Sequence, residues 1–200
     1  NILLGADGPV IIDLPQAVDA AGNQHAQRIK PAETGHVVKF KELYLAHYKK
    51  LTVSGQSTMM HWLINYYLYN LDLSNEENNR MIFELNDLRI KEDLAFYPGD
   101  QLSKAIYLQI FISALRANAT TWALDFINKY TVKLLPEFRE TMKCQAYAFL
   151  YFHTKEYGKV LNYLNKVEFI DIMDKLQTRI LTAKTYYELN ELETLLHYVD

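Results

Sequence analysis

Two polar side chains flank a pair of short apolar runs at the start of the chain. Asn1 precedes the run at residues 2–4, and Asp13 follows the run at residues 10–12. If these runs pair as antiparallel strands, both side chains lie at the open end of one hairpin and can reach one cation. Amide and carboxylate oxygens suit Mg²⁺ that bridges nucleotide phosphates. The alternative is that Asn1 and Asp13 are solvated polar ends of a hairpin.

Other residue types that often carry catalysis lack the necessary spacing. The histidines are scattered without a His-Glu-x-x-His motif, and the single cysteine excludes thiolate zinc sites. The sequence has no Gly-x-Ser-x-Gly elbow and no phosphate-binding P-loop motif. Asp171 and Asp174 are spaced as a carboxylate pair, as are Glu191 and Glu193, but we expect solvated helix starts or turns there, because acidic residues favour helix amino termini. We therefore expect no catalytic residue and no cofactor.

The segments NILL and VIIDLPQAVD, taken together, resemble the end of the catalytic loop and the metal-binding strand of RIO-type atypical protein kinases. The resemblance covers residues 1–25, and the pattern I-D-x-P-Q-x-V after N-I-L is specific because ordinary kinases carry D-F-G there. It implies that Asn1 and Asp13 are ligands of Mg²⁺ and that the nucleotide is ATP.

The same resemblance implies groups that this chain does not contain. The family's catalytic aspartate would precede Asn1, and its phosphate-pairing lysine and amino-terminal lobe have no counterpart here. The chain alone is therefore not expected to be a kinase. Two explanations remain open, namely the carboxy-terminal portion of a RIO-type serine/threonine kinase or ATPase, or an artificial join of two genes.

Composition and charge favour a globular, cytoplasmic protein. Half of the 200 residues are hydrophobic, which is enough to bury a sizeable core. A net charge of -3 provides no positive field for nucleic acid, and no apolar run is long enough to span a membrane. Cys144 lies in an apolar segment and is expected to be a core residue. We expect neither a nucleic-acid partner nor a membrane partner, although one dense basic cluster contains Lys39, Lys41, Lys49 and Lys50.

The beginning of the chain has the composition of strands and turns, unlike the remainder. Glycine and proline are frequent, and the Asp7-Gly8 pair between the two apolar runs suits a tight turn. A short β-hairpin is therefore predicted. The stretch at residues 31–35 predicts a break before helical periodicity begins. These features divide the chain into a hairpin with its linker at residues 1–33 and a helical domain at residues 34–200.

Apolar residues recur at every third or fourth position from Val37 onward, which predicts amphipathic helices. Ser74 and Glu77 are spaced as a capping box at one helix start. The Pro-Gly-Asp sequence at residues 98–100 predicts a break, and no strand is expected after residue 38. Three helix pairs should follow, at 101–117 with 119–133, 136–153 with 156–166, and 171–189 with 191–200.

Two sets of residues recur in these pairs at intervals of 35. Large side chains that we expect to open each second helix are Trp122, Tyr157 and Leu192. Small side chains nine positions earlier, in each first helix, are Ser113, Ala148 and Ala183. A small residue lets the two helices approach closely, and a large one fills the groove beside it. We therefore expect burial of Trp122, Tyr157, Ala148 and Ala183.

This pattern resembles the tetratricopeptide-repeat (TPR) superfamily over residues 38–200, most clearly over residues 100–200. It departs from the usual motif because the alanine of the second helix is replaced by Asp125, Val160 and Leu195. The resemblance implies an all-α fold of antiparallel helix-hairpin repeats, a TPR-like α-solenoid, behind the β-hairpin. Such arrays leave a concave face open. We therefore expect an interaction scaffold that binds a protein or peptide there and catalyses no reaction.

Overall fold

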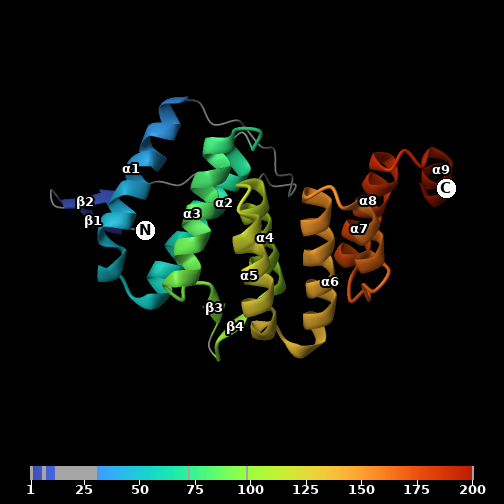
Figure 1. Cartoon of the computed structure of the whole chain (residues 1–200). Coiled ribbons are helices and arrows are strands. Elements are labelled where there is room, and N and C mark those ends of the chain that lie inside the picture. Colours follow the sequence, from blue (N-terminus) through green and yellow to red (C-terminus); the bar gives the residue numbers. More distant parts are fainter. Residues whose placement is uncertain (1, 6–7, 12–30, 72, 98, 200) are drawn as a thin grey trace, which may run out of the picture. The chain divides into compact units, whose positions relative to one another are not determined.

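The computed structural model describes residues 2–5, 8–11, 31–71, 73–97 and 99–199, and Figure 1 shows that most of them are helical. The predicted all-α class is therefore confirmed for the described part of the chain. Two compact units are present, Asn1–Leu73 and Ser74–Asp200. The boundary predicted between residues 33 and 34 falls inside helix α1 (Pro31–His47).

The first unit contains the predicted β-hairpin. Strand β1 (Ile2–Gly5) pairs antiparallel with β2 (Gly8–Ile11), and Ile2 lies opposite Ile11. The predicted turn residue Asp7 lies outside the described residues. The pairing of the two apolar runs is thus confirmed.

Helix α1 is followed in the same unit by the short 3₁₀ helix η1 (Tyr48–Lys50) and by α2 (Val53–Asn70). The predicted break at residues 31–35 is wrong because this stretch forms the first turns of α1. Proline suits a first helical position, where its fixed φ is already helical and its missing N–H has no partner to lose. The Tyr44 hydroxyl donates to the Gln56 carbonyl oxygen at 2.8 Å and ties α1 to α2.

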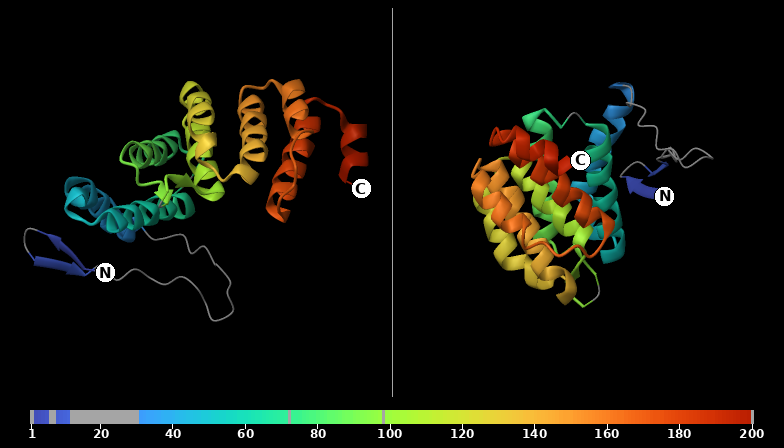
Figure 2. Two further views of the ribbon diagram at one scale, coloured as in Figure 1. Left: turned by 90° about the horizontal axis from the view of Figure 1, so that it is seen from below. Right: turned by 90° about the vertical axis from the view of Figure 1, so that its right-hand side faces the viewer.

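The second unit contains the three predicted helix pairs, with ends within about three residues of those expected. Its elements are α3 (Glu76–Lys91), β3 (Phe96–Tyr97), β4 (Gln101–Leu102), α4 (Lys104–Arg116), α5 (Thr120–Tyr130), η2 (Thr131–Lys133), α6 (Pro136–His153), α7 (Tyr157–Leu164), α8 (Ile172–Glu188) and α9 (Leu192–Val199). In the left view of Figure 2, α4 to α9 follow one another in sequence order along this unit.

Two local predictions in the second unit are wrong. The residue that caps α3 is Asn75 rather than Ser74, and its side-chain oxygen accepts the N–H groups of Glu77 and Asn78 at 2.8 and 3.2 Å. The chain also forms strands after residue 38, since β3 and β4 pair antiparallel. The turn between them places Gly99 at φ 89°, a left-handed conformation that glycine adopts without strain.

The turn that joins the two helices of a pair has the same conformation three times. Asn118, Lys155 and Asn190 each adopt a left-handed backbone, with φ of 57°, 61° and 59°. The next residue in each case donates its N–H to the carbonyl five positions earlier, at 2.9, 2.8 and 2.9 Å. This bond satisfies a carbonyl at the end of the first helix, as in a Schellman motif. The three turns therefore provide a structural register for comparing the pairs.

This register differs from the one predicted from sequence. Asn118 and Lys155 are 37 residues apart, whereas Lys155 and Asn190 are 35 apart. Helix α5 consequently begins at Thr120, and the prediction that Trp122 opens it is wrong. The position of Ala148 and Ala183 is held in the first pair by Phe111 rather than by Ser113.

Large and small side chains are interchanged in the first pair at two positions, seven and four residues before the left-handed turn residue. In the first pair these positions hold Phe111 and Ala114, which are both fully buried. The second pair holds Ala148 and Tyr151 at these positions. The summed side-chain volume is similar in the two pairs, but the large and the small residue occupy opposite positions one helical turn apart. A register based on residue size is therefore wrong in the first pair.

Of the four residues that were expected to be buried, only one is fully buried. Ala148 is fully buried among residues of α6, α7 and α8. Trp122, Tyr157 and Ala183 are only half-buried. The Tyr157 ring packs edge-on against Phe152 of α6, with centroids 5.5 Å apart, and its hydroxyl donates to Glu188 at 3.1 Å near the surface.

Candidate binding surfaces

Asn1 and Asp13, the predicted Mg²⁺ ligands, both lie outside the described residues. Their role therefore stays a prediction. Among residues 31–71, 73–97 and 99–199, no group of three or more His, Cys, Asp or Glu side chains is placed to hold a metal ion. The helices in the same part of the chain are all too short or too polar to cross a membrane.

Cys144 is buried, as predicted, and its thiol contacts the Glu140 carboxylate at 3.7 Å. Burial and the neighbouring carboxylate raise the pKa of this thiol. A raised pKa keeps the thiol protonated and unreactive near neutral pH. The structure thus agrees with a packing role for Cys144.

Lys104 joins two helices that are distant in sequence. Its ammonium group donates to the Asp174 carboxylate at 2.9 Å and also to the Asp171 carboxylate. Asp171 caps α8, and Asp174 returns a bond to the Asp171 N–H, so the two form a capping box. The helix start predicted for this acidic pair is correct, but the expected solvation is wrong for Asp174, which is buried. The contact with Lys104 was not predicted, because 67 residues separate Lys104 from Asp171.

The Lys104 cluster is partly shielded from water. The Asp174 side chain is 1% exposed, and the Lys104 ammonium lies 5.6 Å from the centroid of the Phe138 ring. Burial alone lowers the pKa of Lys104, but hydrogen bonds and charges from Asp171 and Asp174 outweigh it and raise the pKa. The ion pairs of this cluster therefore connect the first turn of α4 to the first turn of α8.

The shared register defines one surface on the first helices of the three pairs. One position of this surface lies six residues before each left-handed turn residue. It is occupied by Ile112, Phe149 and Lys184, none of which is fully buried. The last residue of each first helix is exposed and charged or titratable, namely Arg116, His153 and Glu188. We call these six residues the first-helix column. Its apolar residues are Ile112 in α4 and Phe149 in α6, and its other four residues are polar.

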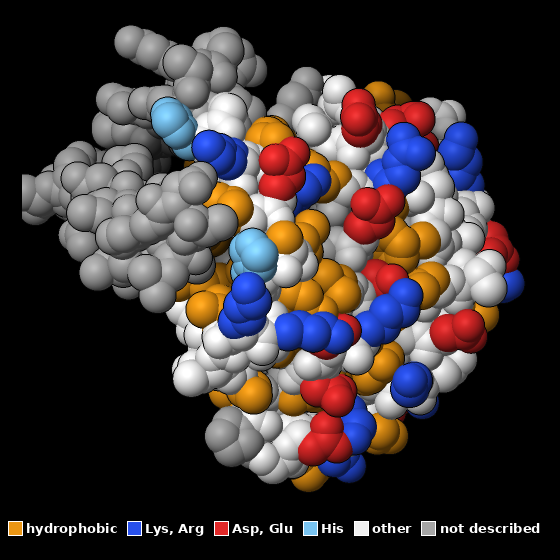
Figure 3. Space-filling model, turned by 90° about the vertical axis from the view of Figure 1, so that its left-hand side faces the viewer, with side chains coloured by type: hydrophobic (Ala, Val, Ile, Leu, Met, Phe, Trp, Pro, Cys, Tyr) orange, Lys and Arg blue, Asp and Glu red, His pale blue; other side chains and the backbone are white. Residues whose placement is uncertain are grey.

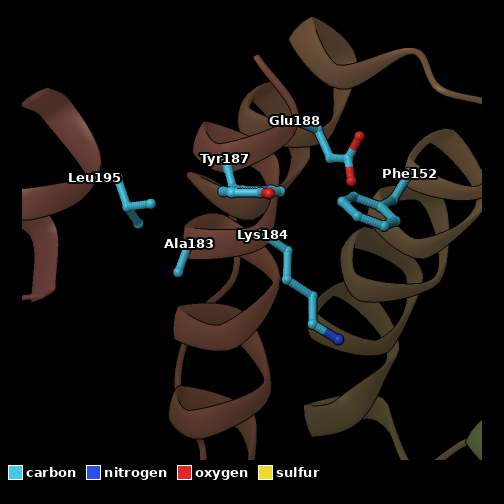
Figure 4. A pocket seen from close by; sticks show the side chains of 6 residues that line it. All are labelled: Phe152, Ala183, Lys184, Tyr187, Glu188 and Leu195. Atoms are coloured by element: carbon cyan, nitrogen blue, oxygen red, sulfur yellow. The ribbon is translucent and has the colours of Figure 1, made fainter. Parts of the chain in front are cut away.

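An open depression of about 490 Å³ lies around the end of α8. Figure 4 shows Lys184 and Glu188 of α8 on the side of Phe152, which comes from α6, whereas Ala183 points toward Leu195 of α9. Tyr187 lies between these two sides and is 66% exposed. The depression therefore extends from the end of the first-helix column to the side of α8 next to α9.

Two buried polar side chains, one in α6 and one in α8, lack hydrogen-bond partners among the described residues. Gln145 of α6 is 1% exposed, and neither its amide nitrogen nor its amide oxygen has a hydrogen-bond partner among the described residues. The buried hydroxyl of Thr178 in α8 also lacks one within this part of the chain. A buried amide without a partner costs about 1–3 kcal/mol. We infer that the unsatisfied Gln145 amide lowers the stability of the fold.

Replacing Gln145 by methionine should therefore raise the free energy of unfolding by about 1 kcal/mol, because the side-chain volume is kept while the unsatisfied amide is removed. The matched control is Gln109→Met. Gln109 accepts a hydrogen bond from the buried Arg89 guanidinium at 3.2 Å, so its loss should destabilise the protein. Urea unfolding followed by circular dichroism compares the two, and destabilisation by Gln145→Met would contradict the inference.

Charges of both signs occur on the face drawn in Figure 3, where basic and acidic side chains are interspersed with hydrophobic ones. The basic cluster predicted from sequence is divided between α1 and η1, and the Lys49 ammonium lies 5.7 Å from the Tyr48 ring centroid.

Comparisons with family models, curated proteins and solved structures found no match to this chain.

Proposed function

We propose that the unit Ser74–Asp200 is a TPR-like α-solenoid that serves as an interaction scaffold for a protein or peptide, without cofactor and without catalysis by this chain. The observation that supports this proposal most strongly is the recurrence of one turn conformation at Asn118, Lys155 and Asn190. Pairs joined by identical turns present equivalent sides to their neighbours, which is the basis of repeat arrays.

Contacts between the helices support the same arrangement. Each first helix contacts its own second helix, and α4 contacts α6, which in turn contacts α8. Because neighbouring first helices lie against each other, residues at the same register position fall on the same side of the array. The first-helix column is then a continuous strip on the concave face.

The chemistry of the column suggests which partner it binds. Ile112 and Phe149 offer apolar contact, while Arg116 and Lys184 offer cations on the same strip. An extended segment with apolar side chains next to carboxylates would pair with both kinds of group. The rim charges would mainly determine the association rate and its dependence on salt.

Reversing the two column cations tests this proposal. The immobilised chain would be exposed to a lysate of its source cells, in parallel with the double variant Arg116→Glu, Lys184→Glu. A partner of the column should be retained by the original chain and lost by the variant, and its purified form should bind at least tenfold more weakly to the variant.

A second double variant, Lys129→Glu with Lys143→Glu, makes the same change in net charge at exposed positions outside the column. It should retain the partner. The proposal would be refuted if both double variants lost the same proteins equally, because the binding would then follow net charge and not the column.

A further inference from the structure

The Lys104 cluster joins two helices that are not neighbours in the row of first helices. In this row α4 contacts α6, and α6 contacts α8. Lys104 nevertheless reaches from α4 past α6 to Asp171 and Asp174 of α8. In repeat arrays each unit normally contacts only the next one. The cluster is therefore an added connection that spans one whole helix pair.

The cluster passes α6 on the side that carries the first-helix column. The Lys104 ammonium, which donates to Asp174 at 2.9 Å, lies 5.6 Å from the centroid of the Phe138 ring in the first turn of α6. Phe138 and Phe149 are 11 residues apart, which is about three helical turns, so both lie on one side of α6. Phe149 belongs to the first-helix column. The cluster thus lies on the column side of α6, nearer the helix starts.

A connection at this place opposes straightening of the row. The axes of packed helices are about 8–10 Å apart, so α4 and α8 would be about 16–20 Å apart in a straight row with α6 between them. Bending toward the column side shortens the path between α4 and α8 over Phe138, whereas bending away from it lengthens that path. Ion pairs that form across α6 on this side therefore favour the bent arrangement.

The charged groups are attached to rigid parts of the two outer helices. Asp171 and Asp174 form the capping box of α8, and the Asp174 side chain is 1% exposed. On the other helix, Lys104 directly follows Ser103, whose side chain accepts the Ile106 N–H and caps α4. A change in the distance between these helix starts must therefore stretch the ion pairs.

We propose that the Lys104 cluster is a clasp that keeps the three first helices bent toward the first-helix column, and so sets the distance between Arg116 of α4 and Lys184 of α8. Lys104 is then a positioning residue for the column. The clasp rests on the proposed function only in taking the column as the binding surface. Breaking the clasp straightens the row and moves the two column cations apart.

Pulsed electron paramagnetic resonance between two spin labels measures this distance without a partner. The labels are attached at Arg116→Cys and Lys184→Cys, which are both exposed positions, and the buried Cys144 is replaced by alanine. Adding Lys104→Met should lengthen the mean distance and broaden its distribution. Lys104→Arg keeps a cation in the cluster and should retain the original distance.

Two further variants complete the experiment. Lys91→Met removes the cation of an ion pair within α3 and should leave the distance unchanged. Asp171→Asn keeps a residue type that caps helices well but removes one carboxylate of the cluster, so it should lengthen the distance less than Lys104→Met does. Circular dichroism verifies that each variant is folded.

An unchanged distance in folded Lys104→Met would overturn the proposal, because helix packing alone would then fix the bend. If Lys104→Met does not fold, an unchanged distance in Asp171→Asn decides against the clasp in the same way. A column that retains no partner would not affect this measurement, so failure of the clasp and failure of the proposed function are distinguishable.

Discussion

Phe126→Ala is expected to lower the free energy of unfolding by about 3–5 kcal/mol, the cost typical of a large core truncation. Phe126 is 1% exposed, and its ring centroid lies 5.0–5.2 Å from those of Tyr107, Trp122 and Tyr130. Removing the ring leaves a cavity and disrupts three aromatic contacts at once. Urea unfolding followed by circular dichroism gives the change.

The matched control is Tyr163→Ala, since Tyr163 occupies the same register position in the second pair. Tyr163 is half-buried and stacks on Tyr147 at 5.0 Å. Its truncation should cost less than half as much, because part of the ring already contacts water. Equal losses in the two variants would mean that the core is not centred on α4, α5 and α6.

The second large effect is expected at Lys104. Lys104→Met keeps most of the side-chain volume and removes the ammonium group, which leaves the Asp174 carboxylate buried without its cation. Breaking a buried ion pair from one side costs about 3 kcal/mol. Lys91→Met is the control, because its pair with Asp87 is exposed on the lysine side and should contribute no more than about 1 kcal/mol.

The pH dependence of this difference follows from the raised pKa of Lys104. The folded protein binds the Lys104 proton more tightly than the unfolded chain does, so the stabilisation is fully present below the ordinary lysine pKa of 10.5. It is lost as the pH rises through the higher pKa of the folded state. The stability gap between the original chain and Lys104→Met should therefore shrink above pH 10.5. A gap that is constant across this range would show that the methionine disturbs packing instead.

Helix positions were largely predictable because they depend on local patterns. The apolar periodicity of α4 to α9 gave the three pairs, and the Asp171 start of α8 followed from its acidic residues. The errors arose where a local signal has two meanings. Proline at position 31 is compatible either with a break or with the first residue of a helix. Ser74 and Asn75 are both residue types that cap helices well, so the sequence does not show which of the two caps α3.

The register could not be read from residue size. Asn118 and Asn190 are residues that often adopt a left-handed backbone, but Lys155 carries no such signal. Because the turn at Lys155 cannot be recognised from sequence, the sequence does not show that the turns of the first two pairs are 37 residues apart. A constant spacing of 35 residues between pairs is then the simplest prediction. The first-helix column could not be predicted, because it depends on this register.

The Lys104 cluster was unpredictable for a different reason. Its members are close only because α4 and α8 start at the same end of the unit, and no pattern in the sequence relates Lys104 to Asp171. Contacts between residues so far apart require the packing of the intervening helices to be known.

Hydrogen exchange on Phe126→Ala most directly tests the central claim, that the helix pairs of Ser74–Asp200 form an array stabilised through shared interfaces. Stability in such arrays is a sum of terms between neighbours, so damage should weaken with distance along the chain. The account predicts the largest loss of amide protection in α4, α5 and α6, a smaller loss in α7 and the smallest in α8 and α9. Equal loss over the whole unit, or a loss confined to α5, would contradict it.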